Sequence, residues 1–383
     1  MNGTIYMPVG EVCSSISDTY REKKNMVTLI NTSDVLEGRV LNHERVPNSN
    51  LKGQFKKTFQ RDDILYSEIR PQNRRFAYVD FSPIDYVAST KLMVIRAKKD
   101  VVSPKYLYYF LKNSSTVAEL QLLAETRSGT FPQITFSEVA NLTIPVPSLA
   151  VQEVIVQTMQ CLEDKITCNE QINDNLADLL QTIYQGRFGN DILAVNQGVL
   201  SDICSYSTDK VAVSELNVRT YFSTENMLSG KAGSTEATSL PTTSQTTACH
   251  KGDTLISNIR PYFKKIVYCE DKCGCSTDVL CFTPSQPCYS AYLFSTLYAD
   301  KFFAFMVAGS KGTKMPRGDK QQIMTYPVVL PSEEELAGFN TIASPLLEQI
   351  YSNRAENKRL SILRDTLLPK LMSGEIDVSA IQL

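Results

Sequence analysis

Residues 64–71 read ILYSEIRP, and residues 254–261, 190 positions further along the chain, read TLISNIRP. Each stretch follows an aspartate, at Asp63 and Asp253, and each leads into a basic segment. A short apolar run that is broken by charge and by proline is typical of a strand followed by a turn. The recurrence indicates two copies of one structural unit.

Two further segments recur in the same order. Val12-Cys13-Ser14 resembles Ile203-Cys204-Ser205, and Gly129-Thr130-Phe131-Pro132 corresponds to Gly312-Thr313-Lys314-Met315-Pro316. A period near 185–190 residues is far longer than a solenoid repeat of about 20–50 residues. The copies keep a framework and differ elsewhere, which is typical of a protein that does one kind of job at two places with different specificity.

The bulk composition is that of a globular protein. The 383 residues suffice for two or three domains, and 43% hydrophobic with 21% charged residues is ordinary. The first residues, MNGTIYMPVG, lack the pattern of a signal peptide, and no apolar run approaches the ~18–20 residues that span a bilayer. We therefore expect a cytoplasmic protein with no membrane contact, whose ten cysteines are reduced thiols.

The formal net charge of −2 is unevenly distributed. Residues 1–148 hold 19 basic and 15 acidic residues, and residues 191–332 hold 13 and 12. Residues 149–190 hold 2 and 6, and residues 333–383 hold 5 and 8. Contact with phosphates requires local positive potential rather than a basic chain, so this distribution permits nucleic-acid binding by the two globular copies.

Each copy is predicted to be mixed α/β. β-branched and aromatic residues predict strands at residues 64–66, 76–79 and 91–95, and at 255–257, 265–268 and 279–282 in the second copy. Helices are predicted to begin after Ser103-Pro104 and near Ala291. Residues 230–247, rich in Ser, Thr, Gly and Ala, predict an exposed, mobile loop.

Two long helices are predicted, after Pro147-Ser148 and after Pro331-Ser332, where apolar residues recur in steps of three and four. Each runs for about 35 residues, or about 50 Å. Both apolar seams contain asparagines near their midpoints, and buried amides cost stability unless they meet partners. We expect the two helices to be antiparallel, with Asn169 or Asn173 facing Asn353 or Asn357 near the midpoint.

With its two Ile-Arg-Pro elements, two Gly-Thr elements and two long helices, the chain resembles the specificity subunit of type I restriction-modification systems. The resemblance implies two similar globular target-recognition domains, separated by two long antiparallel helices with pseudo-twofold symmetry. The expected boundaries are 1–148 and 191–332 for the recognition domains, 149–190 and 333–373 for the helices, and 374–383 for a tail. The second copy departs from the first by reading MPRGD where the first has FPQIT.

The resemblance also implies a function. Each domain would read one half of a bipartite, asymmetric target in double-stranded DNA. The helices would act as a ruler and as a docking surface for two methyltransferase subunits, which modify adenine at N6. Whether endonuclease subunits join the complex stays open, and no cofactor is implied.

The basic turn after the first Ile-Arg-Pro element is the first candidate surface. Arginine can bond guanine bidentately, and Gln or Asn can bond adenine. Because Arg70 and Arg260 recur, structural or phosphate roles are favoured for both over base reading. Gln72, Asn73 and Arg74 change to Tyr262, Phe263 and Lys264, so these positions are the candidates for base reading. The neighbouring Arg75 and Lys265 complete this group.

The Gly-Thr element is the second candidate surface, because a glycine beside hydroxyl and basic groups lets backbone N–H groups approach phosphate. An ordinary surface turn is the alternative. Its residues are Arg127, Ser128, Thr130 and Gln133, matched by Lys311, Thr313, Lys314 and Arg317. A third group, predicted as a basic ribbon in a loop, comprises Lys52, Gln54, Lys56 and Lys57, for which a solvated face is the alternative.

Two other function classes compete with this hypothesis. A purely structural scaffold would carry two adhesive domains on a helical rod and would bind no DNA. A zinc-dependent nucleic-acid-modifying enzyme would use the cysteines between Cys249 and Cys288, but paired C-x-x-C spacing is absent. No nucleotide-binding, metalloprotease or hydrolase motif is present either, so we expect a non-enzymatic chain without a metal site or catalytic residues.

Overall fold

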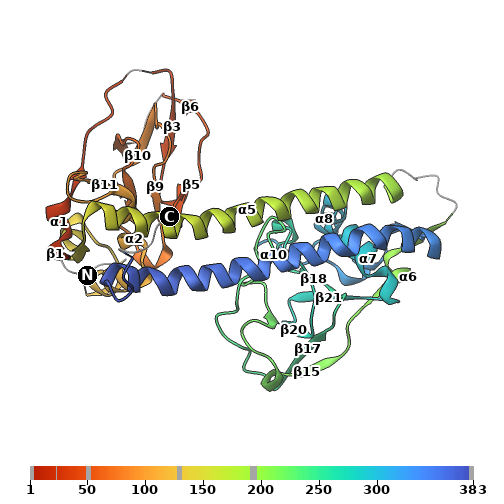
Figure 1. The fold of residues 1–383 in the computed structure, drawn as a ribbon. Helices are drawn as coiled ribbons and strands as arrows, with labels where there is room; N and C mark the ends of the chain where they lie inside the picture. Colours follow the sequence, from red (N-terminus) through yellow and green to blue (C-terminus); the bar gives the residue numbers. More distant parts are fainter. Residues whose placement is uncertain (1–3, 23, 49–52, 127–131, 190–195, 379–383) are drawn as a thin grey trace. The chain divides into compact units, whose positions relative to one another are not determined.

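The computed structural model describes residues 4–22, 24–48, 53–126, 132–189 and 196–378. The chain divides into two compact units, each with its own core: unit 1 is Met1–Thr167 with Asn357–Leu383, and unit 2 is Cys168–Glu356. Both units are mixed α/β, as predicted, and each contains sections of both long helices (Figure 1).

In unit 1, short strands precede the helices. The elements before the basic turn are β1 (Ile5–Pro8), α1 (Val9–Val12), β2 (Cys13–Ile16), β3 (Met26–Ile30), η1 (Thr32–Asp34), β4 (Val35–Leu36), β5 (Arg39–Val40), β6 (Val46–Pro47), β7 (Phe55–Lys57) and β8 (Ile64–Ser67). Those after it begin with η2 (Pro71–Asn73), β9 (Phe76–Tyr78), β10 (Tyr86–Ser89), β11 (Leu92–Ala97), α2 (Pro104–Lys112), α3 (Ser114–Glu125), α4 (Phe136–Asn141) and β12 (Thr143–Val146).

The Ile-Arg-Pro strand lies inside a sheet. An antiparallel sheet has the order β2-β11-β8-β9, and a mixed sheet has the order β6-β3-β10-β7. Successive side chains of β8 point to opposite faces, and both faces are buried. Ile64 and Tyr66 pack into one core, while Leu65 packs into another. This double burial explains why the strand reads as a continuous apolar run.

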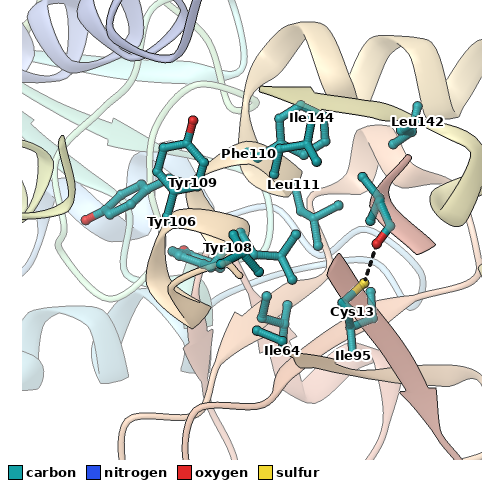
Figure 2. Packing of buried hydrophobic residues seen from close by; sticks show 14 of the residues in the cluster. Cys13, Ile64, Ile95, Tyr106, Tyr108, Tyr109, Phe110, Leu111, Leu142 and Ile144 are labelled. Carbon is teal, nitrogen blue, oxygen red and sulfur yellow. Dashed lines mark hydrogen bonds between the residues drawn. The ribbon is translucent and has the colours of Figure 1, made fainter. Parts of the chain in front are cut away.

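Helix α2 supplies much of the larger core of unit 1. Ser103 is its N-cap and Pro104 occupies its first turn, as predicted. Tyr106, Tyr109 and Leu111 are nearly fully buried beside Ile64 and Ile95 of the sheet (Figure 2). Helix α2 is thereby fixed against the sheet that carries the basic turn.

Unit 2 repeats this construction with nearly the same element order. Its strands and short helices are β13 (Gln197–Val199), α6 (Leu200–Ile203), β14 (Cys204–Tyr206), β15 (Lys210–Ala212), η3 (Val213–Glu215), β16 (Tyr221–Phe222), β17 (Gln245–Cys249), β18 (Thr254–Ser257), η4 (Pro261–Phe263), β19 (Ile266–Tyr268), β20 (Cys273–Cys275), β21 (Val279–Pro284), η5 (Pro287–Tyr289), α7 (Ser290–Tyr298), α8 (Asp300–Ala308), α9 (Lys320–Met324) and β22 (Pro327–Val329).

The first sheet of unit 2 has the order β14-β21-β18-β19, which matches β2-β11-β8-β9 strand for strand. The second sheet differs between the units, with the order β15-β17-β20-β16 here. Two of the three segments that recur in the sequence therefore belong to the sheet whose strand order the two units share. The second sheet, where the two sequences differ, also differs in strand pairing.

The predicted long helices are α5 (Leu149–Phe188) and α10 (Glu333–Ser373). In unit 2 the amide of Asn353 donates to Oδ1 of Asn173 at 2.9 Å, and both residues are buried. One turn further along, Asn169 donates to Glu356 at 2.7 Å. Residue numbers fall along one helix as they rise along the other, so these sections are antiparallel, as predicted.

The same direction holds in unit 1. There, Asn357 donates to the carbonyl of Ile166 at 3.1 Å, and Met159 of α5 and Leu368 of α10 share one core. The pairing of Asn173 with Asn353 confirms the prediction that asparagines of the two seams meet. Asn169 donates to the carboxylate of Glu356, and Asn357 donates to the backbone carbonyl of Ile166.

Replacing Asn353 with alanine is expected to lower the unfolding free energy of unit 2 by about 1–3 kcal/mol, because the buried amide of Asn173 loses its partner. Ser352, exposed on the same helix, is the matched control, and its replacement should change stability by less than ~0.5 kcal/mol. Hydrogen exchange at peptides of α5 and α10 measures both effects. Equal protection in the two variants would show that the asparagine pair contributes nothing to stability.

The prediction of an exposed, mobile loop over residues 230–247 is wrong for part of the segment. Residues 245–247 belong to β17, and Ala237 is buried in a small core with Val211 and Tyr221. Small residues suit a packed core as well as they suit a solvated turn, so the composition of residues 230–247 does not distinguish a buried segment from an exposed loop.

The described residues form helices of very different lengths, and two of these helices, α5 and α10, are 40 and 41 residues long. None combines the length and the apolar character that crossing a bilayer requires.

Candidate nucleic-acid interface

The turn after each Ile-Arg-Pro strand has an unusual backbone that both units share. Arg70 and Arg74 flank η2 with φ of 47° and 53°, and Arg260 and Lys264 flank η4 with φ of 51° and 50°. Left-handed backbone at a residue other than glycine costs roughly 1–3 kcal/mol and often marks a functional site. The turn projects two exposed residues, Gln72-Asn73 in unit 1 and Tyr262-Phe263 in unit 2.

The second candidate element lies beside this turn in both units. The backbone N–H of Arg70 donates to Pro132 at 3.1 Å, and that of Arg260 donates to Pro316 at 2.8 Å. A β-bridge joins the adjoining residues in each case, Ile69 to Gln133 and Ile259 to Arg317. Two segments that are 62 and 56 residues apart in sequence thus form one surface in each unit.

In unit 2 this second segment is a closed loop. Lys311 and Arg317 exchange two backbone hydrogen bonds of 2.9 Å, and Gly312 has φ of 104°. We call residues 311–317 the basic loop. Thr313, Lys314 and Met315 lie exposed on it.

Three basic residues of unit 1 are held by its own framework. Nζ of Lys57 donates to the carbonyls of Thr90 and Leu92 at 3.1 and 2.8 Å, and burial lowers the pKa of this lysine. Arg75 donates to the carbonyl of Ser33 at 3.0 Å. The third of these residues is Arg74, whose guanidinium has several partners.

The guanidinium of Arg74 lies 3.3 Å from Glu37, donates to the carbonyl of Lys112 at 3.4 Å and covers the ring of Phe76. These contacts hold Arg74, Arg75 and Lys57 against the framework of unit 1, and the role of the three residues in DNA contact stays a prediction. The predicted loop placement of the basic ribbon is wrong for two of its residues, because Lys56 and Lys57 lie in β7. Gln54 and Lys56 remain exposed, and Lys56 has no ion-pair partner within the described residues.

In unit 2 three of the six candidate cations form exposed ion pairs. Lys264 lies 3.0 Å from Asp300, Lys311 lies 2.6 Å from Asp319 and Arg317 lies 3.0 Å from Asp278. Hydrogen bonds from Lys231 and Lys264 lower the pKa of Asp300, and a hydrogen bond from Lys311 lowers that of Asp319. Exposed pairs contribute only about 0–1 kcal/mol each, so a phosphate can compete for these cations.

The other three candidate cations of unit 2 form no such ion pair within the described residues. Lys265 donates to the carbonyl of Thr224 at 2.6 Å, and burial lowers the pKa of the lysine, so its contact is internal to the fold. Arg260 is exposed and lies 3.5 Å from the carbonyl of Lys314, which ties the turn to the basic loop. Lys314 itself has no ion-pair partner in the part of the chain that the structure describes.

Four candidate residues lie outside the described residues: Lys52, Arg127, Ser128 and Thr130. Conversely, the sequence did not single out Gly230 and Lys231, whose N–H groups donate to the carbonyls of Phe263 and Lys264 at 2.8 and 2.9 Å. Lys231 also covers the ring of Tyr298 at 4.4 Å. The one sequence signal for this contact is the Gly230-Lys231 pair at the start of a Ser- and Thr-rich segment.

Five cysteines of unit 2 form a packed cluster. Cys249, Cys269, Cys273, Cys275 and Cys281 are buried in one core, with 3.6 Å between the sulfurs of Cys269 and Cys273. Among the described residues, no group of three or more His, Cys, Asp or Glu side chains is arranged to hold a metal ion. The cluster therefore gives the zinc-enzyme alternative no support, and small thiols filling a core account for it.

The comparisons with known proteins concern both units. The family model "Type I restriction modification DNA specificity domain" matches residues 6–177. The type I restriction enzyme HindI specificity subunit of Haemophilus influenzae is 40% identical over 187 residues, which cover 49% of this chain and 41% of that protein. The chain thus spans less than half the length of this relative.

Two more distant proteins match over longer stretches. The type I restriction enzyme MjaIX specificity subunit of Methanocaldococcus jannaschii is 23% identical over 365 residues, covering 78% of this chain and 76% of that protein. The crystal structure of a type I restriction-modification system S subunit from M. genitalium has the same fold, with a TM-score of 0.55 and 16% identity. That alignment covers 97% of this chain and 96% of the other. Together these matches show that residues 6–177 are similar to the DNA specificity domain of type I restriction-modification systems and that the chain has the fold of the S subunit from M. genitalium.

Proposed function

We propose that this chain recognises a bipartite, asymmetric sequence in double-stranded DNA, one half with each unit. One observation carries the proposal. Both units hold the same left-handed turn against the same neighbouring segment, but the two projecting residues change from Gln72-Asn73 to Tyr262-Phe263. A conserved frame that presents different side chains is what two readers of different sequences require.

The exposed residues divide into two roles. The amides of Gln72 and Asn73 each carry a donor and an acceptor that complement N7 and the N6 amino group of adenine in the major groove, so we assign base reading in unit 1 to them. Gln133, bridged to the same turn, extends this surface. The exposed cations at the edges are assigned to phosphates: Lys56, Arg70, Arg260, Lys264, Lys311, Lys314 and Arg317. Gln54 and Thr313 are assigned to the same polar rim.

The chain itself is proposed to be non-catalytic, with methylation of adenine N6 supplied by two partner methyltransferase subunits and cleavage, where it occurs, by endonuclease subunits. Exposed apolar residues on the long helices, such as Ile172 and Leu179 of α5 and Ile362 and Leu363 of α10, fit a docking role. In this proposal residues 1–148 and 191–332 are the recognition domains, and residues 149–190 and 333–373 set the spacing between them. The tail at 374–383 has no assigned role.

The assigned roles are tested by a pair of substitutions in unit 1. Lys56→Ala is expected to weaken binding to all duplexes alike and to lower the slope of log K against log salt by about 0.9, because one phosphate contact is lost. Gln72→Ala should instead relax base preference at one position of one half-site, with a loss of about 1–3 kcal/mol for the preferred base. Titrations of a small duplex panel at several salt concentrations measure both.

Arg75→Ala serves as the control, because the guanidinium of Arg75 donates to the carbonyl of Ser33, and the salt slope of this variant should stay unchanged. If Lys56→Ala and Gln72→Ala weakened every duplex equally and left the slope unchanged, the proposed roles would be wrong.

A further inference from the structure

The tip of the turn in unit 2 exposes an apolar surface. Tyr262 and Phe263 are 50% and 39% exposed, and their ring centroids lie 4.8 Å apart with an angle of 57° between the planes. Met315, on the basic loop beside the turn, is also 50% exposed. Three large apolar side chains therefore lie in water at the surface assigned to DNA.

The fold does not require aromatic residues at this tip. The backbone of η2 has the same conformation, the same flanking left-handed residues and the same pattern of burial, yet it carries Gln72 and Asn73. Leaving an aromatic ring in water costs free energy, and burying the ring against a partner would recover that free energy. The rings are thus better explained by a contact made in a complex than by packing in the module.

The surroundings of the tip indicate the chemistry of that contact. Arg260, Lys264 and Lys314 flank it, and the backbone of Arg260 is bonded to Pro316 of the basic loop. Cations around an apolar centre complement a partner whose charged groups lie around an apolar feature. On the major-groove edge of DNA, that feature is the 5-methyl group of thymine, with phosphates on both sides.

We propose that Tyr262 and Phe263, with Met315 beside them, contact the 5-methyl groups of thymines in the half-site read by unit 2. This inference rests on the proposed function and adds the base class to it. Unit 1, with amides at the same two positions, reads its half-site without depending on thymine methyl groups.

The test replaces thymine with uracil, which removes only the methyl group and leaves base pairing intact. The probe is a duplex enriched from a random library by the full chain. In it, each thymine of one half-site at a time is replaced by uracil. Removing a contacted methyl should weaken binding about fourfold, the fold-change that corresponds to about 0.8 kcal/mol for one buried carbon. Uracil in the other half-site should leave affinity unchanged within about 1.5-fold.

A double variant separates a direct contact from a general effect of uracil on the duplex. Tyr262→Gln with Phe263→Asn places the unit 1 tip on the unit 2 turn, and the matched backbone of η2 indicates that the turn accommodates these residues. This variant should lose the dependence on the methyl group, so thymine and uracil duplexes bind it equally. The Gln72→Ala, Asn73→Ala variant should keep the fourfold difference.

The outcomes are distinct. An enriched duplex that binds equally well with uracil in either half-site would overturn the inference and leave the proposed function standing. So would a double variant that keeps the full uracil effect, because the methyl groups would then be read elsewhere. If the full chain enriched no sequence at all, the proposed function itself would fail, and this inference with it.

Discussion

Arg96→Ala is expected to destabilise unit 1 by about 3–5 kcal/mol, because it leaves a buried carboxylate without its counter-charge. Nε and Nη2 of Arg96 each donate to one oxygen of Asp63 at 2.8 Å. Asp63 is 0% exposed and also accepts the N–H of Gln60 at 2.8 Å. The hydrogen bonds from Arg96 to Asp63 raise the pKa of the guanidinium. Asp63 immediately precedes β8, so the pair secures the strand that carries the turn.

The second copy provides a matched control. Asp253 occupies the equivalent position and is 1% exposed, but Thr283 stands where unit 1 has Arg96. Burial raises the pKa of Asp253, since no guanidinium compensates for its loss of solvent. The hydroxyl of Thr283 has no hydrogen-bond partner within the described residues, so Thr283→Ala removes no counter-charge and should cost less than about 1.5 kcal/mol. Hydrogen exchange at peptides of β8 and β18 compares the two, and equal losses of protection would contradict the role assigned to the Arg96–Asp63 pair.

The second large effect concerns salt. We expect affinity for the target duplex to fall about a thousandfold between roughly 50 and 200 mM salt, the loss produced by about six phosphate contacts. The seven cations assigned to phosphates supply that number, although the chain as a whole has a net charge of −2. Equilibrium titration of the full chain with a labelled duplex at four or more salt concentrations gives the slope directly.

A scaffold protein with two adhesive domains makes the opposite prediction. It would show no measurable affinity for DNA at low salt, or a slope near zero. Serum albumin, also an acidic protein, serves as the control for nonspecific loss of the duplex.

The framework of this protein could be predicted from its sequence, because framework residues recur. The two Ile-Arg-Pro strands, Pro104 at the start of α2 and the asparagines on the long helices were all found at the expected places. Each is a local signal: an apolar run ended by proline, a helix start, or polar residues on a periodic seam. Two copies made each signal stronger than one copy would have been.

The side-chain partners could not be predicted in the same way. Arg74, Arg75 and Lys57 have the composition of a DNA-binding surface, but their partners lie far away in sequence, at Lys112, Ser33 and Thr90. Only the folded chain shows which backbone carbonyls these cations contact. Left-handed backbone at Arg70 and Arg260 was equally hidden, because nothing in their type favours it.

Binding selection with the full chain tests the central claim most directly. Wild type, Gln72→Ala with Asn73→Ala, and Tyr262→Gln with Phe263→Asn would each be presented with the same random duplex library. We predict a bipartite, asymmetric target for the wild type, and for each variant a change confined to one half-site, a different half for each. A continuous or palindromic target, or changes in both halves with either variant, would contradict the account of two units that each read one half.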